Sequence, residues 1–184
     1  FRGKVTDRNG KVLVSNRQIY TVTFDPKLVE DDPAIVPGEN GTVHSESVAR
    51  AMLRLLRLLQ EQGIAWEDGL PVSLNAPYSY PFPEATGTQR VRFQNFLRDR
   101  DWSLTEITAD TKLPLMSGKL LKEFELSASS ALSADQLMEL MRKDFGIPES
   151  FTEQEARLTL GVLYELRLRT LERNAATVPY LLAE

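Results

Sequence analysis

Apolar and polar positions alternate at both ends of the chain, and this pattern predicts β-strands. Near the N-terminus, short β-prone stretches flank a polar segment that contains Asp7, Asn9 and Gly10. These three residues supply the side-chain acceptors and the positive φ angle that a chain reversal requires. At the other end, Pro179 biases Val178 away from helix, so the tail is predicted to be extended. We expect one small, mostly antiparallel sheet that contains or adjoins Val5, Val12, Val14, Val22 and Val178.

Between the two ends, apolar positions recur every three to four residues, which predicts amphipathic helices. Helices are expected at about 46–61, 89–100, 134–145 and 153–173. The predicted fold class is therefore α+β, with a small, mostly antiparallel sheet formed by N-terminal and C-terminal strands and a large inserted helical lobe at about 38–173.

Local signals place the starts of the last two helices. Ser133–Gln136 and Thr152–Glu155 have the spacing of a capping box, in which two side chains satisfy backbone groups reciprocally. Glu153 and Arg157 have the i,i+4 spacing of a favourable ion pair on a helix surface.

The segment at 63–88 is rich in proline and aromatic residues and is predicted to be an ordered loop, with a short strand at 72–74. Its rings suggest a platform for sugar rings or a partner, but packing against the helices is favoured because large rings bury well. The rings concerned are Trp66, Tyr78, Tyr80 and Phe82 of this segment, together with Trp102 beyond it.

Composition indicates a folded globular domain. The chain has 184 residues, 42% hydrophobic and 26% charged, which suits one domain. No apolar run approaches the ~18 residues needed to span a bilayer. The net charge of −4 argues against a nucleic-acid partner, because such proteins usually carry a basic excess.

Residues for metal and cofactor chemistry are scarce. There is no cysteine, and the single histidine, His44, is expected in an exposed loop. A zinc site would then need three carboxylates, so neither a metal nor a cofactor is expected. Asp31 and Asp32 are expected to lie in a solvated loop. Arg50, Arg54 and Arg57 form a basic stripe, predicted to be a solvated face rather than a phosphate or partner site.

The sequence of residues 2–16, RGKVTDRNGKVLVSN, closely resembles the opening of the pedestal (dimerisation) domain of class B penicillin-binding proteins. That family places an Arg-Gly, a short strand, Asp-Arg-Asn-Gly, a Leu-Ala-like pair and an Asn in this order; Val14 stands here where Ala is usual. The stretch FGIPESFTEQEARLTLGVLYELRLR resembles the helical subdomain that follows, and ATVPYLLAE resembles a strand returning to the sheet. The resemblance implies a structural role, in the base of the pedestal, for Arg2, Gly3, Asp7, Arg8, Asn9, Gly10 and Asn16.

The resemblance also implies a function and a location. Residues 1–184 would be a fragment, a pedestal that holds a downstream D,D-transpeptidase domain of the same chain away from the membrane. The family's pedestal contacts other cell-wall proteins, including the SEDS-type glycan polymerase. An anchor helix upstream of this chain would place it on the extracytoplasmic face of the bacterial cell membrane.

No catalytic residue is expected in this chain. A penicillin-binding transpeptidase uses Ser-x-x-Lys, Ser-x-Asn and Lys-Thr-Gly, and the sequence contains none of the three; Ser117-Gly118-Lys119 is one residue too short. The alternative is a stand-alone glycan-binding module or a carboxylate-based glycan-acting enzyme, built on the acidic residues and the aromatic loop.

Overall fold

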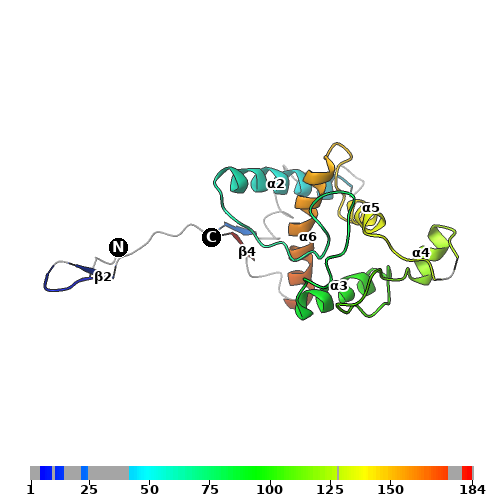
Figure 1. Cartoon of the computed structure of the whole chain (residues 1–184). Coiled ribbons are helices and arrows are strands. Elements are labelled where there is room, and N and C mark those ends of the chain that lie inside the picture. Colours follow the sequence, from blue (N-terminus) through cyan, green and yellow to red (C-terminus); the bar gives the residue numbers. More distant parts are fainter. Residues whose placement is uncertain are drawn as a thin grey trace.

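The computed structural model describes residues 5–9, 11–14, 22–24, 42–127, 129–173 and 180–183. Helices build most of this part of the chain (Figure 1). They are α2 (Thr42–Glu61), α3 (Gly87–Asp99), α4 (Gly118–Glu123), α5 (Ala134–Asp144) and α6 (Glu153–Arg173). The strands are β1 (Val5–Thr6), β2 (Val12–Val14), β3 (Val22–Phe24) and β4 (Tyr180–Ala183).

The predicted α+β class, with one small sheet, is wrong. The described strands form two separate antiparallel pairs, β1 with β2 and β3 with β4, and they are not joined into one sheet. In the second pair Thr23 lies opposite Leu181 and Phe24 opposite Tyr180. Ladders of two to four residues have too little surface to build a core, so the body of the fold is helical. Val178, which we expected beside the sheet, lies outside the described residues.

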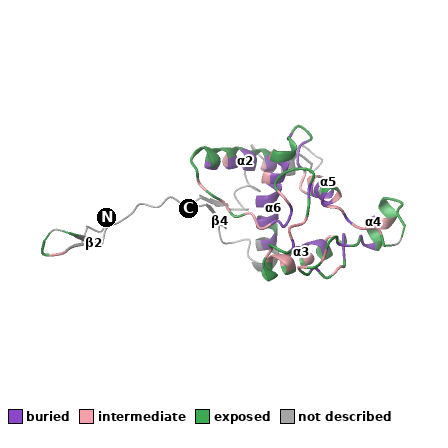
Figure 2. Ribbon diagram, viewed as in Figure 1, coloured by how far each residue is buried: buried purple, intermediate pink, exposed green. Residues whose placement is uncertain are grey.

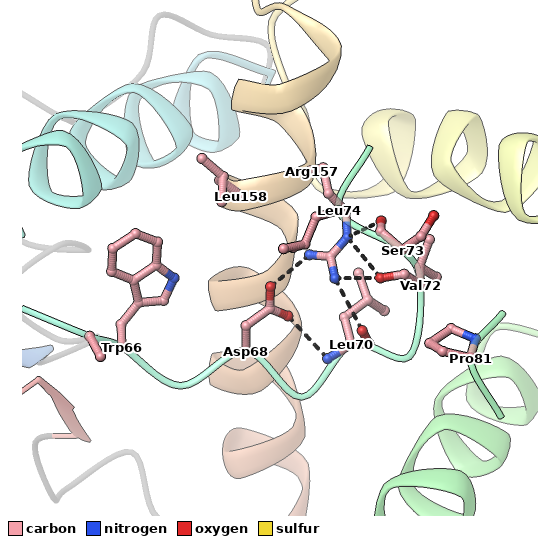
Figure 3. A pocket seen from close by; sticks show the side chains of 10 residues that line it. Trp66, Asp68, Leu70, Val72, Ser73, Leu74, Pro81, Arg157 and Leu158 are labelled. Atoms are coloured by element: carbon pink, nitrogen blue, oxygen red, sulfur yellow. Dashed lines mark hydrogen bonds and ion pairs between the residues drawn. The ribbon is translucent and has the colours of Figure 1, made fainter. Parts of the chain in front are cut away.

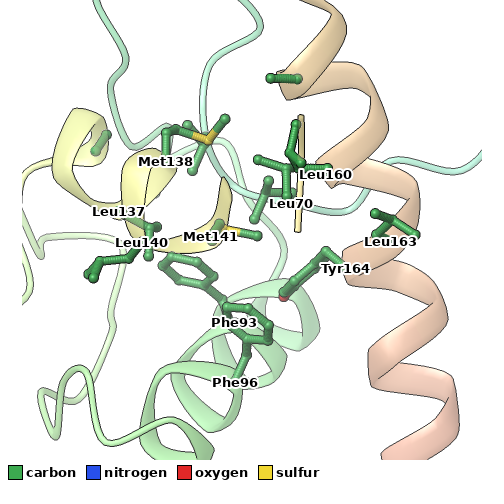
Figure 4. Packing of buried hydrophobic residues seen from close by; sticks show 14 of the residues in the cluster. Leu70, Phe93, Phe96, Leu137, Met138, Leu140, Met141, Leu160, Leu163 and Tyr164 are labelled. Carbon is green, nitrogen blue, oxygen red and sulfur yellow. The ribbon is translucent and has the colours of Figure 1, made fainter. Parts of the chain in front are cut away.

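The core is formed where α2, α3 and α5 pack around α6, together with the loop that connects α2 to α3. Buried and exposed residues alternate along the ribbons of these helices, so each helix has a buried and an exposed face (Figure 2). Tyr164 of α6 meets Phe96 of α3 edge to face, with ring centroids 5.0 Å apart. Leu160, Met141 and Phe93 are completely buried in the same cluster (Figure 4). Helix α6 is therefore the central element against which the other segments are placed.

The helices predicted near the C-terminus are confirmed, and so are their capping boxes. Ser133 and Gln136 satisfy each other's backbone groups at the start of α5. At the start of α6 the backbone N–H of Thr152 donates to Glu155 Oε2 at 3.0 Å, and that of Glu155 donates to Thr152 Oγ1 at 3.3 Å. A third capping box, between Thr86 and Gln89 at the start of α3, was not predicted.

Helix α2 begins earlier than the sequence indicates. It starts at Thr42 rather than near residue 46, so His44 lies within a helix and not in a loop. The Gly and Asn residues at 38–41 mask this start, because they are typical of loops. The predicted strand at 72–74 is also wrong: this segment is irregular, and its carbonyl groups are used in another way.

Candidate functional site

The most distinctive polar group in the described structure is the buried guanidinium of Arg157, in the second turn of α6. Its residue is only 2% exposed. Nη1 donates to Asp68 Oδ2 at 2.8 Å, and Nη2 donates to the carbonyl oxygens of Leu70 and Val72 at 3.1 and 2.7 Å. Nε donates to the carbonyl of Ser73 at 3.1 Å (Figure 3). The buried cation is thus compensated by one carboxylate and three carbonyl groups, as a buried charge requires.

Two glycines allow the loop to approach α6 this closely. A Cβ atom at Gly161 of α6 would lie 2.6 Å from the carboxylate of Asp68. A Cβ atom at Gly69 of the loop would lie 2.1 Å from Glu165 Oε1. Each glycine therefore faces a carboxylate of the opposite segment, and the backbone N–H of Leu70 donates to the other oxygen of Asp68 at 3.2 Å.

A cavity of about 550 Å³ opens beside Arg157, and we call it the Arg157 cavity. Its apolar walls are formed chiefly by Trp66, Leu70, Val72, Leu74, Pro81 and Leu158 (Figure 3). Its polar side chains are already engaged: Asp68 with Arg157, and Ser73 Oγ with the carbonyl of Asn75 and the N–H of Ser79. The cavity suits an apolar group, and the groups that line it hold the loop rather than perform acid–base chemistry.

A second cavity, of about 460 Å³, lies beside Tyr78 and the start of α6. The Tyr78 hydroxyl donates to the carbonyl of Glu153 at 3.0 Å and lies 3.2 Å from its Oε2 atom. Burial, together with the charge of Glu153, raises the pKa of Tyr78 to about 12. Arg142 donates to the other oxygen of that carboxylate at 3.1 Å. Tyr78 is therefore protonated at neutral pH and serves as a structural donor, not as a base.

A third cavity, the arginine pocket, has a volume of about 280 Å³. It is lined by Arg50, Leu53, Arg54, Arg57, Ser150, Phe151 and Glu155. Arg57 pairs with Glu155 across the gap between α2 and α6. The backbone N–H of Thr152, and then Arg57, hold the pKa of Glu155 below its usual value, so this carboxylate is charged at neutral pH.

The aromatic residues of the loop do not form a platform. Tyr78, Phe82 and Trp102 are buried, and Trp66 and Tyr80 pack against the core. Burial raises the pKa of Tyr80, whose hydroxyl donates to the carbonyl of Leu132 at 3.2 Å. Of the five rings, Trp66 lines the Arg157 cavity.

The structure describes three of the seven residues expected to shape the base. The N–H of Asp7 donates to the carbonyl of Lys11, and Asp7 Oδ1 accepts from the N–H groups of Asn9 and Lys11, each at 2.8 Å. Arg8 and Asn9 are exposed at the tip of this reversal. The other four lie outside the described residues; they are Arg2, Gly3, Gly10 and Asn16. Asp31 and Asp32 also lie outside them.

Ser117, which stands in the incomplete Ser-x-x-Lys-like stretch, has a structural role. Ser117 caps α4, where its Oγ accepts from the N–H of Leu120 at 3.3 Å. Among the described side chains, no group of three or more His, Cys, Asp or Glu residues is arranged to hold a metal. A search of the described helices for one long and apolar enough to cross a membrane finds none.

Arg157 was misread from the sequence. The predicted pair with Glu153 is wrong, because Arg157 lies on the buried side of α6 and Glu153 binds Arg142 instead. A signal was present: Arg157 lies three residues before Leu160 in the same predicted helix, and so close to its apolar stripe. Its partners could not be found by spacing, since Asp68 is 89 residues away.

Comparison with known proteins agrees with the family resemblance of the N-terminal sequence. The family model described as Penicillin-binding Protein dimerisation domain matches residues 1–158. The match spans residues 38–130, for which no resemblance was apparent from the sequence. A search of curated proteins finds no match.

Proposed function

This chain belongs to the penicillin-binding protein dimerisation domain family, and we propose that it is the non-catalytic pedestal of a peptidoglycan D,D-transpeptidase. The observation that carries the proposal is the family match over residues 1–158 of the 184. In this role the chain positions a catalytic domain and contacts other proteins, and it performs no chemistry of its own.

The surroundings of Arg157 support a mechanical role. All the hydrogen bonds that bind this side chain to the loop join segments that are 84 to 89 residues apart in the chain. A buried guanidinium with this set of partners is inaccessible to a substrate, and it keeps the loop at 68–73 in one place on α6. Such a connection suits a domain that must hold its shape.

The finer parts of the proposal follow the family. The partner in the same chain is a downstream transpeptidase domain, and a SEDS-type glycan polymerase or other cell-wall proteins are the partners in other chains. The pedestal comprises residues 1–184, with the helical region at about 38–173 inserted into it. It lies on the extracytoplasmic face of the bacterial cell membrane, attached by an anchor helix that precedes this sequence.

The absence of catalysis is tested with a fluorescent penicillin and a denaturing gel. We expect no covalent band on the 184-residue chain and a band on the full-length parent protein. A stoichiometric band on the isolated chain would show that it carries a nucleophile, and would overturn the proposal. An unlabelled parent, with its fold intact, would overturn the transpeptidase part alone.

The structural motif is tested in the parent protein. We expect Gly10→Val to destabilise the reversal by about 1 kcal/mol or more, because the sequence predicts a positive φ angle at this turn glycine, and such an angle disfavours a Cβ atom. Growth should then fail in a strain that depends on this copy, while penicillin still labels the protein. Asp31→Ala and Asp32→Ala are the controls and should support growth; if they abolish it with the fold intact, the acidic segment is a functional site.

A further inference from the structure

We propose that the arginine pocket binds a phosphate group. The inference does not depend on the pedestal role, because it rests on the side chains that line this pocket. Of the lining residues that the structure describes, three are arginines and one is a glutamate, which gives a formal charge of +2. The partner class that fits is an oxyanion with several acceptor oxygens, which arginine can bind with two parallel hydrogen bonds.

The arginines are brought together by their spacing on α2. Arg50, Arg54 and Arg57 follow one another at i, i+4 and i+7, so they lie on one face of the helix. Like charges at these spacings repel one another and weaken a helix. An anion between them would reduce that repulsion, and the three side chains line a common volume of about 280 Å³.

Among the lining residues that the structure describes, Glu155 is the one carboxylate, and it pairs with one of the three arginines, Arg57. Glu155 Oε1 accepts from Arg57, and Oε2 accepts from the backbone N–H of Thr152 in the capping box of α6. Both oxygens are therefore committed. Arg54 is exposed, and it makes no hydrogen bond or ion pair within the part of the chain that the structure describes.

The opposite wall supplies a low-dielectric surface and a hydroxyl group. Phe151, which is 7% exposed, and the exposed Ser150 line the pocket just before the start of α6. An apolar wall behind a cluster of like charges strengthens the field that a counter-ion experiences. Ser150 Oγ is a further donor for a phosphate oxygen.

The test uses the 184-residue chain and two probes. Inorganic phosphate is titrated by calorimetry, and vesicles of phosphatidylcholine with and without phosphatidylglycerol are tested by flotation. Saturable binding of inorganic phosphate identifies a soluble phosphate as the ligand. Flotation that requires phosphatidylglycerol identifies a lipid headgroup.

Arg54→Glu should weaken whichever binding is seen by about tenfold or more, since a charge-assisted hydrogen bond is lost and a repulsive charge added. Arg54→Lys should give an intermediate affinity, because it keeps the charge and loses the planar fork. Arg98→Glu is the matched control: an exposed arginine on α3 is given the same charge change outside the pocket. Binding of neither probe, or equal losses in Arg54→Glu and Arg98→Glu, would overturn the proposal.

Discussion

Two side chains near the start of α6, two residues apart, form ion pairs in different surroundings. Arg157 pairs with Asp68, with side chains 2% and 17% exposed, whereas Glu155 pairs with Arg57, with side chains 24% and 58% exposed. Residues two positions apart point to nearly opposite sides of a helix. The comparison shows that one helix uses the same chemistry in two ways: a buried pair that holds a loop in place, and a surface pair that helps to join α2 to α6.

The largest effect is expected from Arg157→Ala. It removes the donor that binds Asp68 Oδ2 and the guanidinium bonds to the carbonyl groups of Leu70, Val72 and Ser73, so we expect a loss of about 3–5 kcal/mol in the free energy of unfolding. Urea denaturation measures this. Asp68→Ala is the matched variant and should cost less, because Arg157 keeps its bonds to the carbonyl groups. A loss below about 1 kcal/mol for Arg157→Ala would mean that the buried pair behaves like a surface pair.

Gly161→Ala should have the next largest effect. The new methyl group would lie 2.6 Å from the carboxylate of Asp68 and would push it away from Arg157. We expect a loss of about 1–3 kcal/mol, as for other overpacked sites, seen as a lower melting temperature. Gly118→Ala is the control, since a Cβ atom there has nothing within 4 Å. Equal stability of the two variants would show that the loop can move aside without cost.

Tyr78→Phe tests the polar contact at the first turn of α6. Loss of the bond to Glu153 should cost about 1 kcal/mol at neutral pH. The raised pKa of Tyr78 means that this contribution is complete below pH 10, the usual tyrosine value, and is lost as the pH rises to about 12. Unfolding measured across this interval should show the advantage of wild type over Tyr78→Phe disappearing. An advantage that is constant with pH would exclude the bond as its source.

The smallest effect is expected from Arg57→Ala. An exposed pair contributes about 0.2–1 kcal/mol, and added salt screens it. The difference from wild type in urea denaturation should therefore be small and should shrink as salt is added. Arg54→Ala, which removes a neighbouring arginine but no ion pair, should be close to neutral. A salt-insensitive loss of more than about 2 kcal/mol for Arg57→Ala would place this pair with the buried one.

The sequence predicted the parts of this fold that depend on neighbouring residues. The starts of α5 and α6 could be predicted because both partners of each capping box lie within four residues of the sequence. The partners are Ser133 with Gln136, and Thr152 with Glu155. The family could also be predicted, since residues 2–16 resemble the opening of its members, and the match over residues 1–158 confirms the prediction.

The predictions that were wrong concern contacts between residues that are distant in the sequence. Period-2 patterns identify strands, but they do not say whether two pairs of strands join into one sheet. The segment at 72–74 was predicted to be a short strand, yet the carbonyl groups of Val72 and Ser73 accept from Arg157, which lies more than 80 residues later in the chain. The Arg157 cavity and the arginine pocket both join α6 to segments about 70 or more residues earlier, so neither could be derived from spacing.

The reciprocal contacts between glycines and carboxylates have a consequence for how this domain varies among relatives. Asp68 faces Gly161, and Glu165 faces Gly69, so a side chain cannot be added at either glycine while the facing carboxylate stays in place. Substitutions at positions 68 and 161 should therefore occur together over evolution, and so should those at 69 and 165. A relative that carries a side chain at position 161 is expected to have a smaller residue at position 68 and a different partner for the buried arginine.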